Sequence, residues 1–414
     1  MTTKYDIFLH LAEINTSIKT TDVIRYFKKK KHEYSNIYRL LNQLAGEKLI
    51  AKSNKGFQVK LSDKSRLLFD ILTFCISNNI NYNYIMDKRL GIFISKALIK
   101  ETFSTKDFDL NPKTFRKYVD ILFKYGLLVK LSSKPFKAKI TMNYLFKSSL
   151  QYYNITINNN KPVKITLIKP IQKEFIKFKR LVKKNKRKYN LIIKEFEIRF
   201  IHSSLSLEGN PITLPDTIKI LKEEIIPKDL RAADIKEVQN YQNAVDTMIT
   251  DATNGNGLDQ QKILNFHYLS MEHRSEIAGK IRTVPVIIKG NPKFKIAQVN
   301  VIRPLLDILM NEYKQFIKKR HSLEKIIEFA AYFHNQFQFI HPFRDGNSRT
   351  ARLITFHLLL YYDIPVLDIP LGLHDQYLSR TKGYKKRDDI DLSRTLQEII
   401  LYNLETINEK LKST

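Results

Sequence analysis

The sequence predicts a mainly α-helical protein, in which two small α+β domains precede one larger helical domain. The chain has 414 residues, of which 43% are hydrophobic, so it can form two or three separate cores. Apolar residues recur at helical spacing along most of its length. Pairs of strands around short turns are indicated in three places, at residues 49–61, 127–142 and 279–299.

The first small domain is predicted at residues 1–62. Two short helices, at 5–13 and 21–27, precede a third helix that Ser35 can cap. A strand, an Asn-Lys-Gly turn and a second strand follow within residues 49–61. Three helices and a hairpin in this order are typical of a winged helix-turn-helix unit.

A second unit with a similar order of elements is predicted at residues 63–150. A helix at 65–76, a further helix at 112–125 and a hairpin around a Ser-Ser-Lys-Pro turn make up this unit. Residues 151–190 are polar and rich in lysine, which predicts a basic linker or a solvated helix.

The outer faces of the last helices in both units carry basic, amide and aromatic side chains. They are Tyr34, Asn36, Tyr38, Arg39, Asn42 and Gln43 in the first unit, and Lys113, Thr114, Arg116, Lys117 and Lys124 in the second. Such a helix can enter the major groove of DNA, where Arg, Asn and Gln contact base edges and Lys contacts phosphate. The alternative is that these units form a homodimer or contact the larger domain.

The formal net charge is +30, from 71 Lys and Arg against 41 Asp and Glu. A field this positive favours nucleic acid or nucleotide phosphates, although it is also compatible with a lysine-rich chain that is merely soluble. The chain has no apolar run that could cross a membrane, and its first residues do not resemble a signal peptide. The single cysteine, Cys75, excludes a disulfide framework. We therefore expect a cytoplasmic protein.

The segment His341-Pro-Phe-Arg-Asp-Gly-Asn-Ser-Arg349 joins two predicted helices. Pro342 interrupts the first helix, and the second begins at Gly346, so the loop leads into a helix N-terminus. The free N–H groups of a helix N-terminus bind phosphate. Arg349 and Arg352 share one helix face and would add two positive charges. Asp345 is placed to hold Mg²⁺ and His341 to act as a general base.

This segment resembles the Fic family motif HPFx(D/E)GNGRxxR. The matching residues are His341, Pro342, Phe343, Asp345, Gly346, Asn347, Arg349 and Arg352, whereas Ser348 stands where the family usually has Gly. The resemblance covers about residues 191–404 and implies an all-helical Fic core, placed at 191–414, with a β-hairpin flap. It implies a protein adenylyltransferase, which transfers AMP from ATP to a Ser, Thr or Tyr hydroxyl of a target protein or of the chain itself.

The resemblance also implies roles for the motif residues. His341 would accept the proton of the target hydroxyl, and Asp345 would bind Mg²⁺. The phosphates of ATP would be held by Gly346, Asn347, Ser348, Arg349 and Arg352. Downstream, Tyr384 loosely matches an aromatic position that borders the adenine, with an ordinary surface helix as the alternative.

Two further segments resemble parts of the family. The predicted hairpin at 279–299 resembles the flap that holds the target by strand addition, through Val284, Val286, Ile287 and Ile288; the alternative is a surface hairpin without a partner. A helix near 196–209 resembles the inhibitory motif (S/T)xxxE(G/N), with Ser204, Glu208 and Gly209 in register. The resemblance implies that Glu208 pairs with Arg352 in place of the ATP γ-phosphate, and in some relatives the same Glu serves removal of AMP.

The sequence also bears on two other classes of function. The first is a DNA-binding transcriptional regulator: its N-terminal units would bind DNA, and its Fic domain would sense nucleotide without catalysing a reaction. A metal enzyme is disfavoured, because His267 and His273 have no acidic partner at ligand spacing and the sequence has no HExxH.

Overall fold

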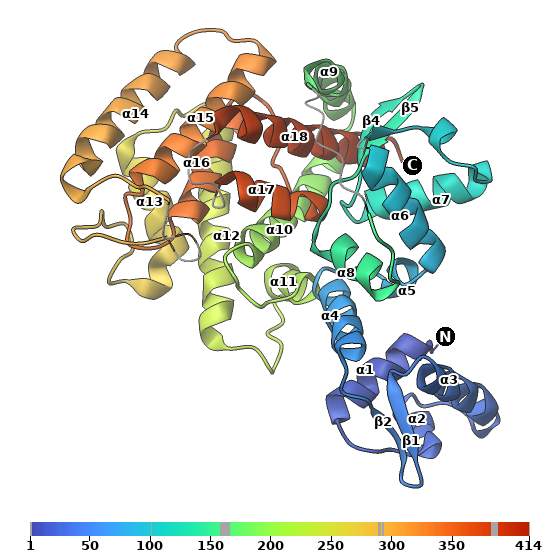
Figure 1. The fold of residues 1–414 in the computed structure, drawn as a ribbon. Coiled ribbons are helices and arrows are strands. Elements are labelled where there is room, and N and C mark those ends of the chain that lie inside the picture. Colours follow the sequence, from blue (N-terminus) through green and yellow to red (C-terminus); the bar gives the residue numbers. More distant parts are fainter. Residues whose placement is uncertain are drawn as a thin grey trace. The chain divides into compact units, whose positions relative to one another are not determined.

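The computed structural model describes residues 2–100, 102–157, 166–288, 291, 294–381 and 388–413, and Figure 1 shows its ribbon. The chain divides into two compact units. The first is Met1–Lys96 with Tyr144–Asn158, and the second is Ala97–Asn143 with Asn159–Thr414. Residues 63–150, predicted as one domain, therefore contribute to both units, and the four predicted domain ranges stay predictions.

The first unit is built from short helices and one hairpin. Its elements are α1 (Lys4–Ile14), α2 (Thr20–Tyr26), α3 (Tyr34–Gly46), β1 (Ile50–Ser53), β2 (Gly56–Val59), α4 (Asp63–Ser77), α5 (Tyr82–Ile85) and α8 (Tyr144–Tyr152). Strands β1 and β2 are antiparallel, and Ile18 pairs with Phe57 beside them. Apolar side chains of α1, α2 and α3 are fully buried, including Phe8, Val23 and Leu41. The order of three helices and a hairpin agrees with the predicted elements, while the winged-helix assignment stays a prediction.

The start of α3 differs from the prediction. A 3-10 turn at Lys31–Glu33 runs directly into the helix, so Glu33 occupies the N-cap position without a side-chain hydrogen bond. Ser35, the predicted cap, lies inside the helix. Helix α5 and helix α6 (Lys88–Lys100) were not predicted from the sequence, and the boundary between the two units falls within α6.

The second unit is a helical assembly with one small sheet. Its helices of eight residues or more are α7 (Pro112–Lys124), α9 (Ile168–Lys184), α10 (Lys186–Ser206), α12 (Ala232–Thr253), α13 (Gln260–Met271), α14 (Ile302–Ile317), α15 (Leu323–Ile340), α16 (Asn347–Tyr361), α17 (His374–Thr381) and α18 (Asp389–Lys412). A short helix α11 (Leu214–Ile218) continues as a π-helical turn at Lys219–Glu223. The sheet has the order β3-β5-β4, from β3 (Thr102–Phe103), β4 (Val129–Ser133) and β5 (Phe136–Lys139).

Helix α16 is the centre of this unit. It packs against α12, α13 and α15, and almost every residue from Arg349 to Leu360 is buried (Figure 1). A helix that is buried on all sides belongs to a core. The small sheet lies against α18, where Lys130 and Lys139 form ion pairs with Glu409 and Glu398. In the part of the chain that the structure describes, no helix has the length and apolar character to span a membrane.

The predicted hairpin at 279–299 is not formed within the described residues. Residues 282–288 and 294–298 carry no strand, and Lys289, Gly290, Pro292 and Lys293 lie outside the described residues. The backbone N–H of Arg282 donates to Pro342 O at 2.8 Å, and that of Ala297 donates to Phe339 O at 2.9 Å. The backbone of both arms therefore bonds to the chain around residues 339–343, where Ile281 also pairs with Phe343, and no strand pairing joins the described residues of the two arms.

Candidate active site

The motif loop is defined by two residues with left-handed backbone. His341 ends α15 with φ of 49°, and its N–H donates to Phe337 O at 2.9 Å. Gly346 precedes α16 with φ of 75°. A Cβ atom at Gly346 would lie 2.9 Å from Met271 Sδ, so the position requires glycine for space as well as for conformation.

The catalytic candidate His341 is half-buried, and its Nδ1 lies 3.3 Å from the carbonyl oxygen of Gln338. A carbonyl oxygen only accepts, so this hydrogen bond requires the proton to be on Nδ1. The neutral imidazole then carries its lone pair on Nε2. This tautomer is the one that can accept a proton at Nε2.

The loop between His341 and α16 is fixed by Asn347 and His267. The Asn347 side chain accepts from Phe343 N–H at 2.9 Å and donates to Phe343 O at 2.8 Å. The Phe343 ring stacks on His267 with centroids 3.6 Å apart. His267 accepts from Gly279 N–H at Nδ1 (2.9 Å) and therefore donates from Nε2 to Asp345 O (3.0 Å). Burial lowers the pKa of His267 to about 4, so it is a neutral structural residue.

Arg282 fixes the same loop from the other side. Its guanidinium donates to His341 O at 2.7 Å, to Ala297 O at 2.6 Å and to Val284 O at 3.2 Å. The residue is only 5% exposed. The carbonyl of the catalytic candidate is thus held by a buried cation.

The second motif arginine, Arg352, meets the predicted inhibitory residues. It is 1% exposed, and its Nη2 lies 3.0 Å from Glu208 Oε1 and 2.9 Å from Ser204 O. Its Nε donates to Ser204 Oγ at 2.6 Å, and that hydroxyl donates to Tyr241 OH at 2.7 Å. Burial opposes the charge on Arg352, but Glu208 outweighs it and raises the arginine's pKa above its ordinary value. Arg352 is therefore a buried, permanent cation.

Gly209 ends the helix that delivers Glu208. The N–H of Asn210 bonds to Leu205 O at 3.1 Å and that of Gly209 to Ser206 O at 3.0 Å, while Gly209 has φ of 93°. These two bonds and a left-handed glycine make a Schellman motif. The chain therefore turns immediately after Glu208, and the predicted stop at Gly209 agrees with this geometry.

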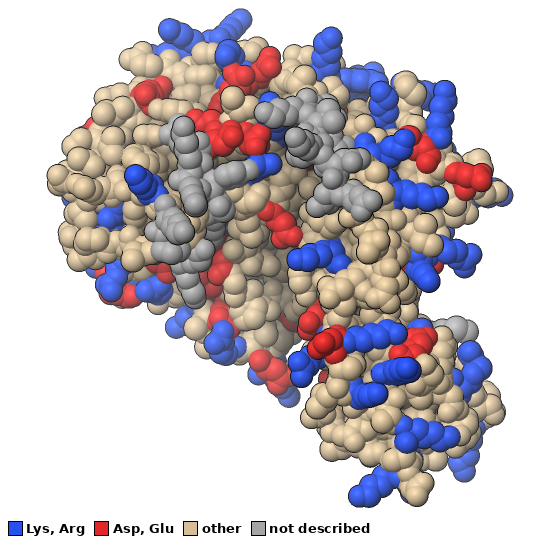
Figure 2. Space-filling view, in the orientation of Figure 1, with Lys and Arg blue, Asp and Glu red and all other residues tan. Residues whose placement is uncertain are grey.

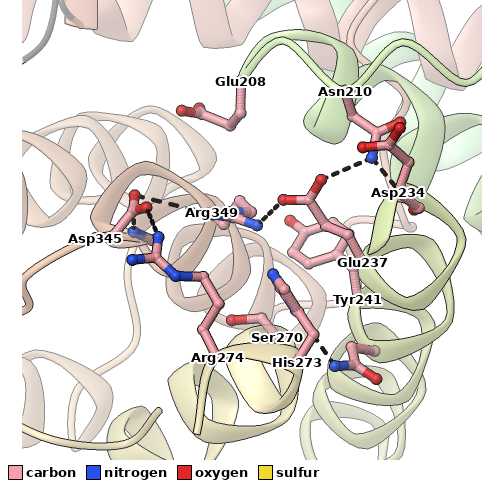
Figure 3. Close-up of polar contacts among 12 residues, drawn as sticks. Glu208, Asn210, Asp234, Glu237, Tyr241, Ser270, His273, Arg274, Asp345 and Arg349 are labelled. Carbon is pink, nitrogen blue, oxygen red and sulfur yellow. Dashed lines mark hydrogen bonds and ion pairs between the residues drawn. The ribbon is translucent and has the colours of Figure 1, made fainter. Parts of the chain in front are cut away.

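The first motif arginine, Arg349, lies in a chain of charged groups that Figure 3 shows. Its Nη1 forms an ion pair with Glu237 of α12, and its Nη2 lies 3.9 Å from Asp345 Oδ1. The other Glu237 oxygen accepts from Asn210 Nδ2 at 2.6 Å. The Arg349 side chain is 6% exposed, so the pair with Glu237 is largely shielded from water.

Asp345 is the candidate metal ligand. Its Oδ2 pairs with Arg274 at 2.5 Å, and its Oδ1 accepts from Gly346 N–H at 2.7 Å (Figure 3). Burial would raise its pKa, but Arg349, the Gly346 N–H and Arg274 outweigh burial and hold the pKa of this carboxyl below its ordinary value. The described residues contain no group of three or more His, Cys, Asp or Glu side chains suited to a metal. One ionised, half-exposed carboxylate fits Mg²⁺ that takes its other ligands from water and phosphate.

The remaining predicted residues are placed as follows. Ser348 lies in the first turn of α16 and is partly exposed. Val284 and Ile287 are 46% and 77% exposed, and Val286 and Ile288 are half-buried. Tyr384 lies outside the described residues.

Five contacts of the site were missing from the sequence prediction. They involve Glu237, Tyr241, His267, Arg274 and Arg282. Each of the five lies between 37 and 112 positions from its partner in the site, and no local pattern marks them.

Comparison with known proteins finds relatives of the segment that carries this geometry. Residues 257–359 match the model of the Fic/DOC family. The protein adenylyltransferase Fic of Drosophila persimilis is 26% identical over 186 residues, which are 44% of this chain and 35% of that protein. Its counterpart from Aedes aegypti is 28% identical over 175 residues, 42% of this chain and 34% of that protein. The chain thus spans about a third of the length of the curated relatives it matches.

Two solved structures share the fold. A Fic domain containing signaling protein from Bacteroides thetaiotaomicron has a TM-score of 0.52 at 21% identity, over 59% of this chain and 97% of that one. Fic-1 from C. elegans has a TM-score of 0.50 at 18% identity, over 58% of this chain and 71% of that one. Residues 257–359 therefore match the Fic/DOC family in sequence, and the larger helical part of the chain shares the fold of these two structures.

Proposed function

We propose that this protein is an autoinhibited protein adenylyltransferase, which transfers AMP from ATP to a Ser, Thr or Tyr hydroxyl of a protein. The observation that carries the proposal is the 3.0 Å ion pair between Glu208 and the fully buried Arg352. A buried guanidinium beside a helix N-terminus is a strong phosphate ligand, and here a carboxylate occupies it. The relatives that bear the name protein adenylyltransferase support the same activity.

The chemistry follows from the tautomer of His341. The oxygen of the target hydroxyl attacks the α-phosphorus of ATP, and the bond from that phosphorus to the bridging oxygen of the β-phosphate breaks. The leaving group is pyrophosphate, and the hydroxyl proton passes to Nε2 of His341. Arg349, Arg352 and the N–H groups at the start of α16 stabilise the negative charge of the phosphates.

Asp345 would hold Mg²⁺, which supplies neutralisation of phosphate charge when bound. Both side-chain amide atoms of Asn347 bond to the backbone of Phe343, so Asn347 would bind phosphate through its backbone N–H. These residue roles call for ATP and Mg²⁺.

Inhibition follows from the position of Glu208. While its carboxylate occupies Arg352, the γ-phosphate of ATP has no guanidinium to bind, so ATP settles without its α-phosphate in line for attack. The same carboxylate could orient a water for hydrolysis of a target–AMP bond, which would make the reverse reaction, de-AMPylation, available to this site.

The test uses labelled ATP and Mg²⁺ with the wild-type chain, Glu208→Gly and Glu208→Gly/His341→Ala. We expect weak labelling of the chain or of added lysate proteins by wild type, stronger labelling by Glu208→Gly, and none by the double variant. Parallel reactions with labelled UTP, GTP and CTP identify the nucleotide. Absence of labelling by Glu208→Gly with every nucleotide would refute the transferase assignment.

The target would bind beside the loop. Val284, Val286, Ile287 and Ile288 follow Arg282, which is bonded to His341 O, so an extended target segment along them would lie next to the catalytic candidate. The exposed side chains of Val284 and Ile287 offer apolar contacts to such a segment.

A second candidate function is DNA binding, in a regulator whose Fic domain senses nucleotide. The side chains of Asn36, Arg39 and Gln43 on α3 are exposed, as are Arg116 and Lys117 on α7. Figure 2 shows Lys and Arg side chains distributed over the visible face of the first unit. These groups could contact base edges and phosphates.

The full chain and its Arg39→Ala/Gln43→Ala variant would be titrated against duplex DNA across a salt series. Binding that weakens as salt rises, and that the variant reduces, supports DNA recognition. No binding at low salt, together with a dimeric mass in solution, would favour the homodimer alternative.

A further inference from the structure

One short segment reaches both motif arginines. Ser204 and Glu208 contact Arg352. Asn210, two residues after Glu208, donates to Glu237, which pairs with Arg349 (Figure 3). The left-handed Gly209 lets the chain turn between Glu208 and Asn210, so their side chains serve different partners. The segment that inhibits the site therefore also supports its other arginine.

Arg349 needs a fixed counter-charge. Its side chain is 6% exposed, and its Nε is buried without a hydrogen-bond partner among the described residues. Glu237 engages only Nη1. This leaves Nη2, at 3.9 Å from Asp345, as the donor for an incoming phosphate oxygen. Glu237 thus orients the guanidinium without using the donor that an anion would need.

Asn210 is itself rigidly held. Its N–H bonds to Leu205 O at 3.1 Å, and its Oδ1 accepts from Ile212 N–H at 3.0 Å. Its Nδ2 is therefore aimed at Glu237 Oε2, 2.6 Å away. Because the Asn210 side chain is already ordered, it loses little conformational entropy when it bonds to Glu237, and it can therefore hold the Glu237 carboxylate in place.

We propose that Glu237 is a positioning residue for Arg349 and that Asn210 holds it in place. Glu208 then inhibits the site, whereas Asn210, from the same segment, supports phosphate binding. The inference rests on the proposed function of the motif as a nucleotide site. It follows that activation requires only the Glu208 side chain to leave Arg352, because displacing the whole segment would also take Asn210 from Glu237.

The test compares Asn210→Ala, Glu237→Gln and their double variant, each in the wild-type and Glu208→Gly backgrounds. Asn243→Ala is the matched control, because Asn243 is an exposed amide on the same helix α12. The dissociation constant for ATP with Mg²⁺ is measured by calorimetry, and AMP labelling is measured in parallel. Melting temperatures identify any variant that fails to fold. If Glu237→Gln fails to fold, Glu237→Asp replaces it.

We expect Asn210→Ala and Glu237→Gln each to weaken ATP binding by about tenfold, from the loss of a hydrogen bond to a charged group. The double variant should bind no more weakly than Glu237→Gln, because the two residues act through one contact. Neither change should activate the wild-type background, and both should raise KM for ATP more than they lower kcat in Glu208→Gly.

Two results would overturn the inference. Activation by Asn210→Ala comparable to that by Glu208→Gly would show that the segment only inhibits. Unchanged ATP affinity in both variants would show that Arg349 needs no positioning by Glu237. Failure of the proposed function would give a different result. Glu208→Gly would then bind ATP but label no protein, and the ATP dissociation constants of the Asn210 and Glu237 variants would still test the role of Glu237.

Discussion

Replacing Glu208 with Gln tests how much the negative charge of Glu208 contributes to the stability of the folded protein. The side chain of Arg352 is 1% exposed, and it forms an ion pair with Glu208, whose side chain is 21% exposed. Removing one partner of a fully buried pair costs about 3–5 kcal/mol. Partial exposure of Glu208, and the remaining bonds of Arg352 to Ser204, reduce this to about 2 kcal/mol. For a unit of this size we expect the melting temperature to fall by about 4 °C without nucleotide.

ATP should reverse this loss. In Glu208→Gln the γ-phosphate meets an arginine without a competing carboxylate, so stabilisation by ATP and Mg²⁺ should exceed that of wild type by about 2 kcal/mol. Scanning calorimetry with and without nucleotide measures both effects, and Glu223→Gln, an exposed glutamate, is the control. Equal melting temperatures and equal gains from ATP in wild type and Glu208→Gln would refute the argument that Glu208 is the counter-charge of Arg352.

Three further predictions concern the loop. Arg282→Ala should lower AMP labelling at least tenfold in Glu208→Gly with little change in ATP affinity, because it frees the backbone at His341; comparing kcat with the dissociation constant checks this. Gly346→Ala should destabilise the protein by about 1–3 kcal/mol, measured by denaturant unfolding, because φ is 75° and Met271 is in the way. His267→Phe should flatten the loss of stability between pH 6.5 and 4: the folded pKa is depressed to about 4, so the contribution of His267 is present above pH 6.5 and is lost as the pH falls toward 4.

The motif and the inhibitory segment were predictable because their signals are local. Pro342 and Gly346 mark the loop between two helices, and Glu208 stands directly before the glycine that ends α10. The positions of these residues follow from backbone conformation within a few residues. Local sequence is therefore enough to place the catalytic candidate and Glu208 on their elements.

The prediction of a hairpin at 279–299 was wrong within the described residues. The physical reason is a long-range one, which the local sequence does not show. Alternating apolar residues on both sides of a turn indicate two strands, but the partner of each arm is chosen by the fold. Arg282 and Ala297 bond to Pro342 and Phe339, so the arms pair with the motif loop. Pro285 also lacks the N–H that a strand pair would use.

The charge relations of the site explain why the inhibited state can be stable and still reversible. Glu208 lies just beyond the C-terminus of α10, where the helix dipole disfavours a carboxylate by about 0.3–1 kcal/mol. Arg352 offsets this, because it contacts both Glu208 and the Ser204 carbonyl of the last helical turn. When Glu208 leaves, the Ser204 carbonyl and hydroxyl still hold Arg352, so the guanidinium stays oriented for phosphate. The inhibitory contact can therefore be broken at the carboxylate alone, without rebuilding the arginine that the phosphate needs.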